Sequence, residues 1–219
     1  MKLNLWLYKL ENKISRFAIE RLMSLIAGAM LIVFVADLAV TNATDGTVNL
    51  YSYLAFNRAA IFKGEVWRII SFIILYPADS NILFTLLGIY FFYWTGNAVE
   101  TRLGKAKFNL YYLFGILGSI IAGFIVGGMV NTYLNLSLFL AFAFMFPDIE
   151  VLLFFILPIK VKWLGIFEGV LLVLMFFLGG IVTRAALIIA FLNFLLFFGN
   201  DLINVIKRKY REYKWRRGR

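Results

Sequence analysis

Apolar runs of about twenty residues, with polar links between them, constrain the fold of this chain more than any other feature. The first run, Leu22–Val40, carries a single charged residue, near its far end. Of the 219 residues, 63% are hydrophobic, and the mean hydropathy is +0.86. A soluble domain of this size cannot cover so much apolar surface, so lipid must be the solvent. The sequence therefore predicts an all-α integral membrane protein.

The apolar runs predict six transmembrane helices. They are Leu22–Val40, Asn81–Val99, Leu110–Val130, Tyr133–Pro147, Trp163–Gly180 and Arg184–Asn200. Residues 41–80 form a long first loop with no run suited to a full crossing, and its aromatic part, Leu50–Phe62, is expected to lie in the membrane. Val151–Pro158, between the fourth and fifth spans, is predicted to be an interfacial hairpin. Residues 1–21 and 201–219 flank this six-span domain, 22–200.

The positive charges test this topology. Six crossings put both termini on one side of the membrane. Eighteen of the 22 Lys and Arg residues then lie on that side; the remaining four are Arg58, Lys63, Arg68 and Arg184. The positive-inside rule predicts that both termini are cytoplasmic. The net charge of +10 therefore indicates topology, and nucleic acid is not an expected partner.

Both flanking segments are predicted to be amphipathic and basic. In residues 1–21 one helical face is apolar, which favours a helix lying in the headgroup plane; that face is Leu3, Leu7, Leu10, Ile14 and Phe17. In residues 201–219 eight Lys and Arg surround a second apolar face, formed by Leu202, Ile206, Tyr210 and Tyr213. The expected partners of this tail are anionic lipid headgroups.

Small residues recur every four positions along the third span. They are Gly115, Ser119, Gly123 and Gly127. Such a stripe lets helix backbones approach closely. The resulting van der Waals packing holds helices together in lipid, where the hydrophobic effect does not drive their association. We expect this face to pack inside the chain; a seam between two copies is the alternative, and the oligomeric state is left open.

Two motifs resemble the rhomboid family of intramembrane serine proteases, in its bacterial form. The first is the pair Trp67–Arg68 in the long first loop, and the second is the end of the second span, which reads G-x-x-x-E-x-R-x-G through Gly96, Glu100, Arg102 and Gly104. The resemblance implies a rhomboid-like bundle of six spans with a half-embedded first loop. It also implies structural roles for the motif residues.

The catalytic residues of that family are missing from this chain. The resemblance implies a serine in a G-x-S-G turn at the fourth span and a histidine in the sixth, but the chain has no histidine and no G-x-S-G. The nucleophile position falls within Thr132–Ser137, where Ser137 is the only serine, and the histidine position falls near Ala186. The family's oxyanion-stabilising positions fall at Asn81 and Thr85. We expect the vestigial site to be packed shut by Leu136, Leu138 and Ile189.

Two polar residues inside spans are candidates for a buried polar site. Glu168 lies within the fifth span and Asn193 within the sixth. Placing a carboxylate within the bilayer costs free energy unless the group is paired or in contact with water, so it marks a candidate functional position. The chain has no cysteine and no histidine, and no metal or cofactor is predicted.

Together these features predict a catalytically inactive rhomboid-like protein, a pseudoprotease. Loss of both catalytic residues is similar to the derlins, inactive relatives that handle misfolded membrane proteins. That resemblance implies binding of transmembrane client proteins through a lateral groove. Two alternatives are an active protease that uses Ser137 in an atypical site, and a small transporter that uses Glu168, Asn193 and Asp37.

Overall fold

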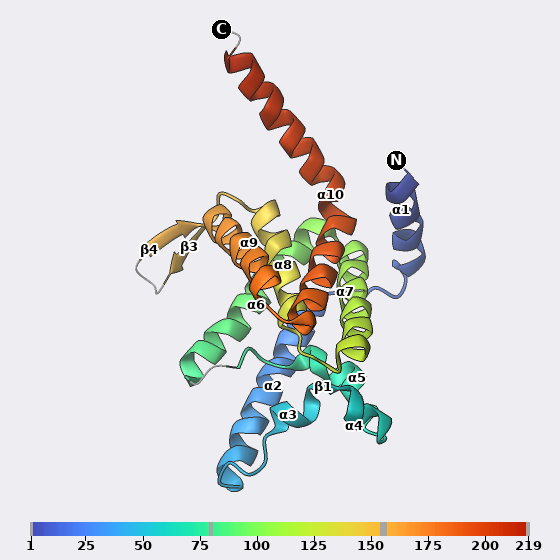
Figure 1. Cartoon of the computed structure of the whole chain (residues 1–219), viewed down its shortest axis with the longest axis vertical. Helices are drawn as coiled ribbons and strands as arrows, with labels where there is room; N and C mark the ends of the chain where they lie inside the picture. Colours follow the sequence, from blue (N-terminus) through green and yellow to red (C-terminus); the bar gives the residue numbers. More distant parts are fainter. Residues whose placement is uncertain (1, 79–80, 154–156, 218–219) are drawn as a thin grey trace.

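The computed structural model describes residues 2–78, 81–153 and 157–217, and most of them are helical (Figure 1). The longer helices are α1 (Lys2–Ile14), α2 (Leu22–Ala43), α6 (Ile82–Leu103), α7 (Lys105–Val126), α8 (Thr132–Met145), α9 (Val161–Leu178) and α10 (Ile181–Arg217). The first loop holds α3 (Leu50–Leu54), β1 (Phe56–Asn57), α4 (Arg58–Phe62), α5 (Arg68–Ser71) and the 3-10 helix η1 (Phe72–Ile74). The remaining elements are β2 (Gly128–Met129), β3 (Glu150–Leu153) and β4 (Leu157–Lys160).

Five helices in the described residues are long and apolar enough to cross a membrane: α2, α6, α7, α9 and most of α10. The chain is therefore an all-α membrane bundle that resides in a lipid bilayer. The predicted fourth span corresponds to α8, which has only 14 residues. At 1.5 Å per residue it is about 21 Å long, shorter than a hydrocarbon core of about 30 Å. The predicted count of six crossings is thus not confirmed, and a crossing by α8 stays a prediction.

The short helix α8 lies at the centre of the bundle. It packs against α6, α7, α9 and α10. Leu134, Leu138, Ala141 and Phe142 on this helix are almost fully buried. A helix enclosed by protein need not match the thickness of the bilayer, because its ends meet other protein and not lipid tails. The position of α8 therefore explains how so short a helix is accommodated.

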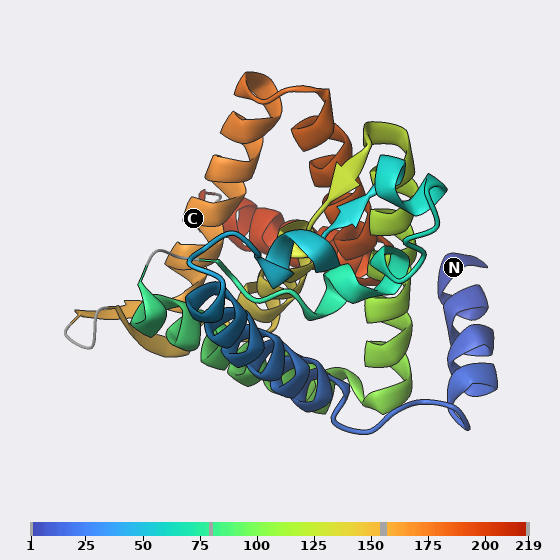
Figure 2. The ribbon, with the colours of Figure 1, turned by 90° about the horizontal axis from the view of Figure 1, so that it is seen from below.

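The bundle has two unlike ends. One end, here called the terminal end, carries α1, the β3–β4 hairpin and the projecting C-terminal part of α10 (Figure 1). The other, here called the loop end, is covered by the first loop (Figure 2). The short strand β1 pairs there with β2, with Phe56 opposite Met129, and so joins the first loop to the connection between α7 and α8.

The third predicted span is displaced in the structure. Helix α7 begins at Lys105, directly after Gly104, and ends at Val126. Gly127, predicted to belong to a helical packing stripe, lies beyond the helix with φ +100° and ends it in a left-handed conformation. The prediction for Gly127 was therefore wrong, because the apolar residues Met129 and Val130 continue the hydropathy of the span past its real end.

The other small residues of that stripe pack inside the chain. A Cβ at Gly115 would clash with Leu134 of α8, and a Cβ at Gly123 would clash with Phe56 of the first loop. Ser119 is buried between them along the same helix. In this structure the small face of α7 thus contacts the chain's own elements.

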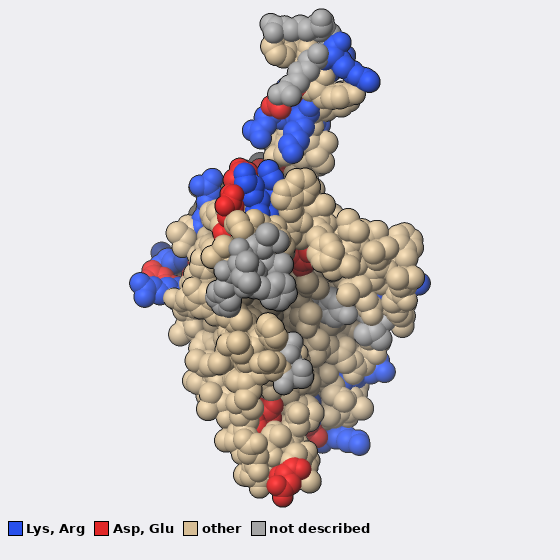
Figure 3. All heavy atoms as spheres, turned by 90° about the vertical axis from the view of Figure 1, so that its left-hand side faces the viewer, with Lys and Arg blue, Asp and Glu red and all other residues tan. Residues whose placement is uncertain are grey.

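The two flanking segments are only partly as expected. Helix α1 ends at Ile14, before the predicted limit of residue 21, and lies beside α7. Helix α10 runs unbroken through residue 200 to Arg217, so no helix boundary separates the sixth span from the basic tail. Figure 3 shows Lys and Arg gathered on this projecting tail, above a broad uncharged surface. The predicted hairpin is the antiparallel pair β3–β4, whose tip lies outside the described residues.

Candidate functional site

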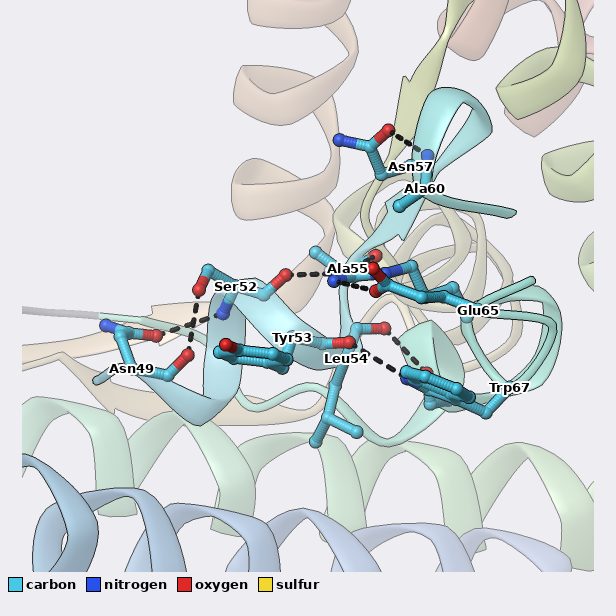
Figure 4. Close-up of polar contacts among 11 residues, drawn as sticks. Asn49, Ser52, Tyr53, Leu54, Ala55, Asn57, Ala60, Glu65 and Trp67 are labelled. Atoms are coloured by element: carbon cyan, nitrogen blue, oxygen red, sulfur yellow. Dashed lines mark hydrogen bonds and ion pairs between the residues drawn. The ribbon is translucent and has the colours of Figure 1, made fainter. Parts of the chain in front are cut away.

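The Trp67–Arg68 pair fastens the first loop (Figure 4). Arg68 donates to the carbonyl oxygens of Ser52 at 2.6 Å and Ala55 at 3.0 Å. Trp67 Nε1 donates to the carbonyl of Tyr53, and Ser71 donates its hydroxyl to that of Leu54. These four carbonyls end α3 and have no partner within that helix, so α5 caps it with side chains.

The Arg68 guanidinium is itself neutralised. It is only 7% exposed and forms an ion pair of 2.6 Å with Glu65. Its charge is therefore used to hold the loop, and it is not presented to a substrate. The structure gives the predicted structural role a specific form, in which side chains of Trp67 and α5 cap the end of α3.

The motif at the end of α6 joins that helix to α2. Glu100 is buried and accepts from the backbone N–H groups of Leu22 and Met23, at 3.2 and 3.3 Å. Those are unpaired donors at the start of α2, where the helix dipole also favours a carboxylate. One turn earlier, Gly96 lies against Met23, and a Cβ there would fall 2.0 Å from its Cγ. The motif thus lets two spans approach and caps one with the other.

The last two motif residues lie at the surface. Gly104 has φ +81° and donates its N–H to the carbonyl of Glu100, which ends α6 and allows α7 to begin at once. Arg102 is exposed, beside Trp94 and Phe146 in a shallow depression at the terminal end.

The positions of the family's catalytic residues are not gathered into one open site. Asn81 is exposed and caps α6 by accepting from the N–H of Leu83 at 2.8 Å. Thr85 is buried one turn later, and its hydroxyl finds no hydrogen-bond partner among residues 2–78, 81–153 and 157–217. Ala186 is buried in α10. An exposed cap and these enclosed positions do not form a common pocket.

Ser137 belongs to a closed polar cluster in the core. It is 1% exposed, and its Oγ lies 2.6 Å from the hydroxyl of Tyr111 on α7. Asn193 of α10 donates to the Ser137 Oγ at 3.4 Å and to the Tyr111 carbonyl at 3.3 Å. The three residues cross-link α7, α8 and α10.

The residues that close Ser137 differ from those predicted. Leu138 is buried, as expected, but Leu136 lines a groove on another side of α8, and Ile189 lies against Gly118. Tyr111 and Asn193 are the side chains that contact the serine hydroxyl. Asn193 therefore belongs to this cluster, and its hydrogen bonds within the described residues do not reach Glu168, the other candidate for a buried polar site.

The side chain of Asn131, which sequence reasoning missed, links the start of α8 to the first loop. Its amide donates to the carbonyls of Ile73 at 3.1 Å and Leu75 at 2.6 Å, at the end of the first loop. The side chain is buried. The first loop is thus tied to the N-terminal end of the central helix.

A lateral groove opens between α6, α8 and α9, with a volume of about 330 Å³. We call it the lateral groove; it is lined by Phe91 and Phe92 of α6, by Thr132, Asn135, Leu136 and Phe139 of α8, and by Leu164, Phe167, Glu168 and Leu171 of α9. Only 11% of the α9 window is buried, against 39% for α7. The outer wall of the groove is therefore a helix that faces lipid over most of its surface.

The lateral groove contains two buried polar groups that find no partner in the part of the chain that the structure describes. Both carboxyl oxygens of Glu168 and the side-chain oxygen of Asn135 are buried and make no hydrogen bond there. Glu168 itself is 9% exposed. Asn135 was missed by sequence reasoning, although an asparagine four residues after Asn131 inside an apolar run was a visible signal. Within the described part of the chain, no three acidic side chains gather where they could share a metal ion.

Comparison with known proteins points to one family. No protein-family profile matches the chain. Rhomboid protease GluP of Bacillus subtilis is 33% identical over 85 residues, which is 38% of this chain and 16% of GluP. YdcA of the same organism, named as a candidate rhomboid protease, is 39% identical over 61 residues, 27% of this chain and 29% of YdcA. These matches support a rhomboid-like superfamily. In both cases the matched part spans less than a third of the relative's own length.

Proposed function

We propose that this chain is a catalytically inactive rhomboid-like membrane protein that binds transmembrane client helices through the lateral groove. One observation carries the proposal. The groove lies beside α9, which has the least buried span among the five long apolar helices of the described residues, and most of its lining side chains are apolar. A helix in the bilayer can approach such a groove sideways without leaving lipid.

The absence of catalysis is part of the same proposal. A serine nucleophile requires a base that takes its proton and a path by which the substrate carbonyl can reach it. The chain offers no histidine. Ser137 is buried, and its hydroxyl is already held by Tyr111. These features favour an inactive protein over an atypical protease.

Labelling with a fluorophosphonate tests inactivity. We expect no labelling of the purified full chain beyond that of a Ser137→Ala variant, with an active rhomboid protease as positive control. Labelling that Ser137→Ala abolishes would contradict the proposal and restore the atypical protease.

Photo-crosslinking tests the groove. A crosslinking residue placed at Phe91 or Leu171 faces the lateral groove, whereas the same residue at Ile121 faces lipid from α7, where Ile121 is exposed. We expect single-span helices in the same vesicles to be captured from the groove positions several times more often. Equal capture from Ile121 would show that contact with clients is unspecific.

We further propose that the terminal end faces the cytoplasm of a bacterium and that the tail binds anionic headgroups there. The distribution of Lys and Arg supports both statements. The chain has no cysteine, so a single introduced cysteine at Tyr210 or Thr47 gives an unambiguous reading. We expect a membrane-impermeant maleimide to reach Thr47→Cys, but not Tyr210→Cys, from outside intact cells.

A further inference from the structure

The lateral groove offers hydrogen-bond acceptors and no cationic donor. Its lining contains the Glu168 carboxyl and the Asn135 oxygen, both buried and without a hydrogen-bond partner among the described residues, while most of the other lining side chains are apolar. No Lys or Arg is among the described lining residues. The groove is therefore complementary to a group that brings hydrogen-bond donors and a positive charge.

The free-energy cost of burying these groups without partners indicates which kind of ligand the groove would bind. A buried polar group without a partner is destabilising, and a carboxyl group at membrane depth more so. Some polar side chains elsewhere in the core find partners, as Ser137 does with Tyr111 and Asn131 does with two carbonyls. Others, such as the hydroxyls of Thr85 and Tyr112, find none among the described residues, but Glu168 differs from them in being a carboxyl group with both oxygens unpartnered there. A ligand that supplies donors to Glu168 and Asn135 would recover in binding what the free protein lacks.

Resting on the proposed client binding, we infer that the lateral groove selects transmembrane helices that carry a lysine at the depth of Glu168. Lysine fits because its ammonium group has three donors and its aliphatic stem can lie along apolar walls such as Phe167 and Leu164. Glu168 lies seven residues into α9, about 10 Å along the helix from the terminal end. The client lysine must therefore lie about 10 Å into the hydrocarbon from that side.

Matched client helices test the inference. The probes are two synthetic single-span helices of leucine and alanine, identical except for one lysine or one methionine at that depth. Each is reconstituted with the full chain carrying the photo-crosslinker at Leu171. We expect the lysine helix to be captured about tenfold more efficiently, the range of a favourable interhelical polar contact. Glu168→Gln should abolish the preference, so that the lysine and methionine helices are captured equally, and Asn135→Ala should reduce the preference in part.

Matched controls separate the possible results. Glu150→Gln removes an exposed carboxylate of the β3–β4 hairpin and should leave the preference intact. Equal capture of both helices by the unchanged protein, with capture still confined to the groove, would overturn the lysine inference alone. Capture of neither helix at Leu171 or Phe91 would overturn the client groove itself. Crosslinks only to a second copy of this chain would also contradict the inference.

Discussion

The first loop and the lateral groove differ in whether their buried polar groups have hydrogen-bond partners among the described residues. In the loop, Arg68, Trp67 and Ser71 donate to four successive carbonyls and Glu65 neutralises the guanidinium. In the groove, Glu168 and Asn135 are buried with acceptor oxygens that find no partner among the described residues. In the described residues, all unpartnered buried side-chain atoms belong to α6, α7, α8, α9 or α10, and none to the first loop.

This difference separates polar residues that hold the fold from those available to a ligand. A satisfied buried network stabilises one conformation, and its loss leaves unpaired groups behind. An unsatisfied group costs stability in the free protein, so its removal should not destabilise it. Substitutions in the two regions are therefore expected to change the free energy of unfolding in opposite directions.

The largest effect is expected at Arg68. Arg68→Ala leaves two buried carbonyls and the Glu65 carboxylate without their partner, and should lower the free energy of unfolding by about 3 kcal/mol. Equilibrium unfolding in mixed micelles measures it. Arg58→Ala is the matched control, because Arg58 also donates to carbonyls, of Phe124 and Ile125, but is exposed; about 1 kcal/mol or less is expected there. Similar losses in the free energy of unfolding for both variants would contradict the proposal that Arg68 holds the first loop more strongly than Arg58 does.

A smaller loss is expected at the junction of α2 and α6. Glu100→Ala removes the acceptor that caps Leu22 and Met23 and should cost about 1–2 kcal/mol in the same measurement. Glu100→Gln keeps one acceptor and should cost less. If Glu100→Ala unfolds no more easily than the exposed neighbour variant Thr101→Ala, the capping role is wrong.

In the lateral groove, the change in the free energy of unfolding should have the opposite sign. Glu168→Leu replaces an unpaired buried carboxyl group with an apolar side chain and should raise the free energy of unfolding by about 1 kcal/mol. Glu168→Gln keeps an unpaired polar group and should not give this gain. A loss from Glu168→Leu as large as that from Arg68→Ala would mean that Glu168 holds the fold, and the contrast between the two regions would disappear.

The smallest effect concerns the ion pair between Glu20 and Lys105, 2.6 Å apart at the surface. The hydrogen bond and charge of Lys105 lower the pKa of Glu20. Because the pKa is depressed in the folded state, the pair stabilises the fold above the ordinary pKa of Glu20 and loses this contribution as the pH falls through the folded value. In Lys105→Met the pKa should rise toward its ordinary value, as followed by carbon NMR of the carboxyl group. Lys107→Met should leave it unchanged, and an unmoved titration in Lys105→Met would contradict the pairing.

Hydropathy located most of the helices but misplaced some of their ends. The first, second and fifth predicted spans match α2, α6 and α9 within a few residues, because charged or turn-forming residues bound them. The third was displaced because Met129 and Val130 are apolar, although Met129 lies in β2 and Val130 in the connection that follows it. The length of α8 could not be foreseen, since enclosure by other helices, which a single sequence does not display, decides whether a short helix is tolerated.

The sequence motifs predicted which residues hold the first loop and α6 in place, but not which contacts those residues make. Trp67, Arg68 and Glu100 act on backbone groups of other elements, and backbone partners leave no pattern in a sequence. Tyr111, Asn131 and Asn135 were missed for a related reason. Each lies in an apolar run, where an isolated polar residue gives no indication of its partner until the helices are packed.

The unequal burial of α8 and α9 has a consequence for the membrane around them. The enclosed α8 is insulated from changes in lipid, whereas α9, 18 residues or about 27 Å long, meets acyl chains along most of its length. Longer or shorter acyl chains would therefore tilt α9 and leave α8 in place. Since these two helices form facing walls of the groove, we expect its width to change with lipid chain length.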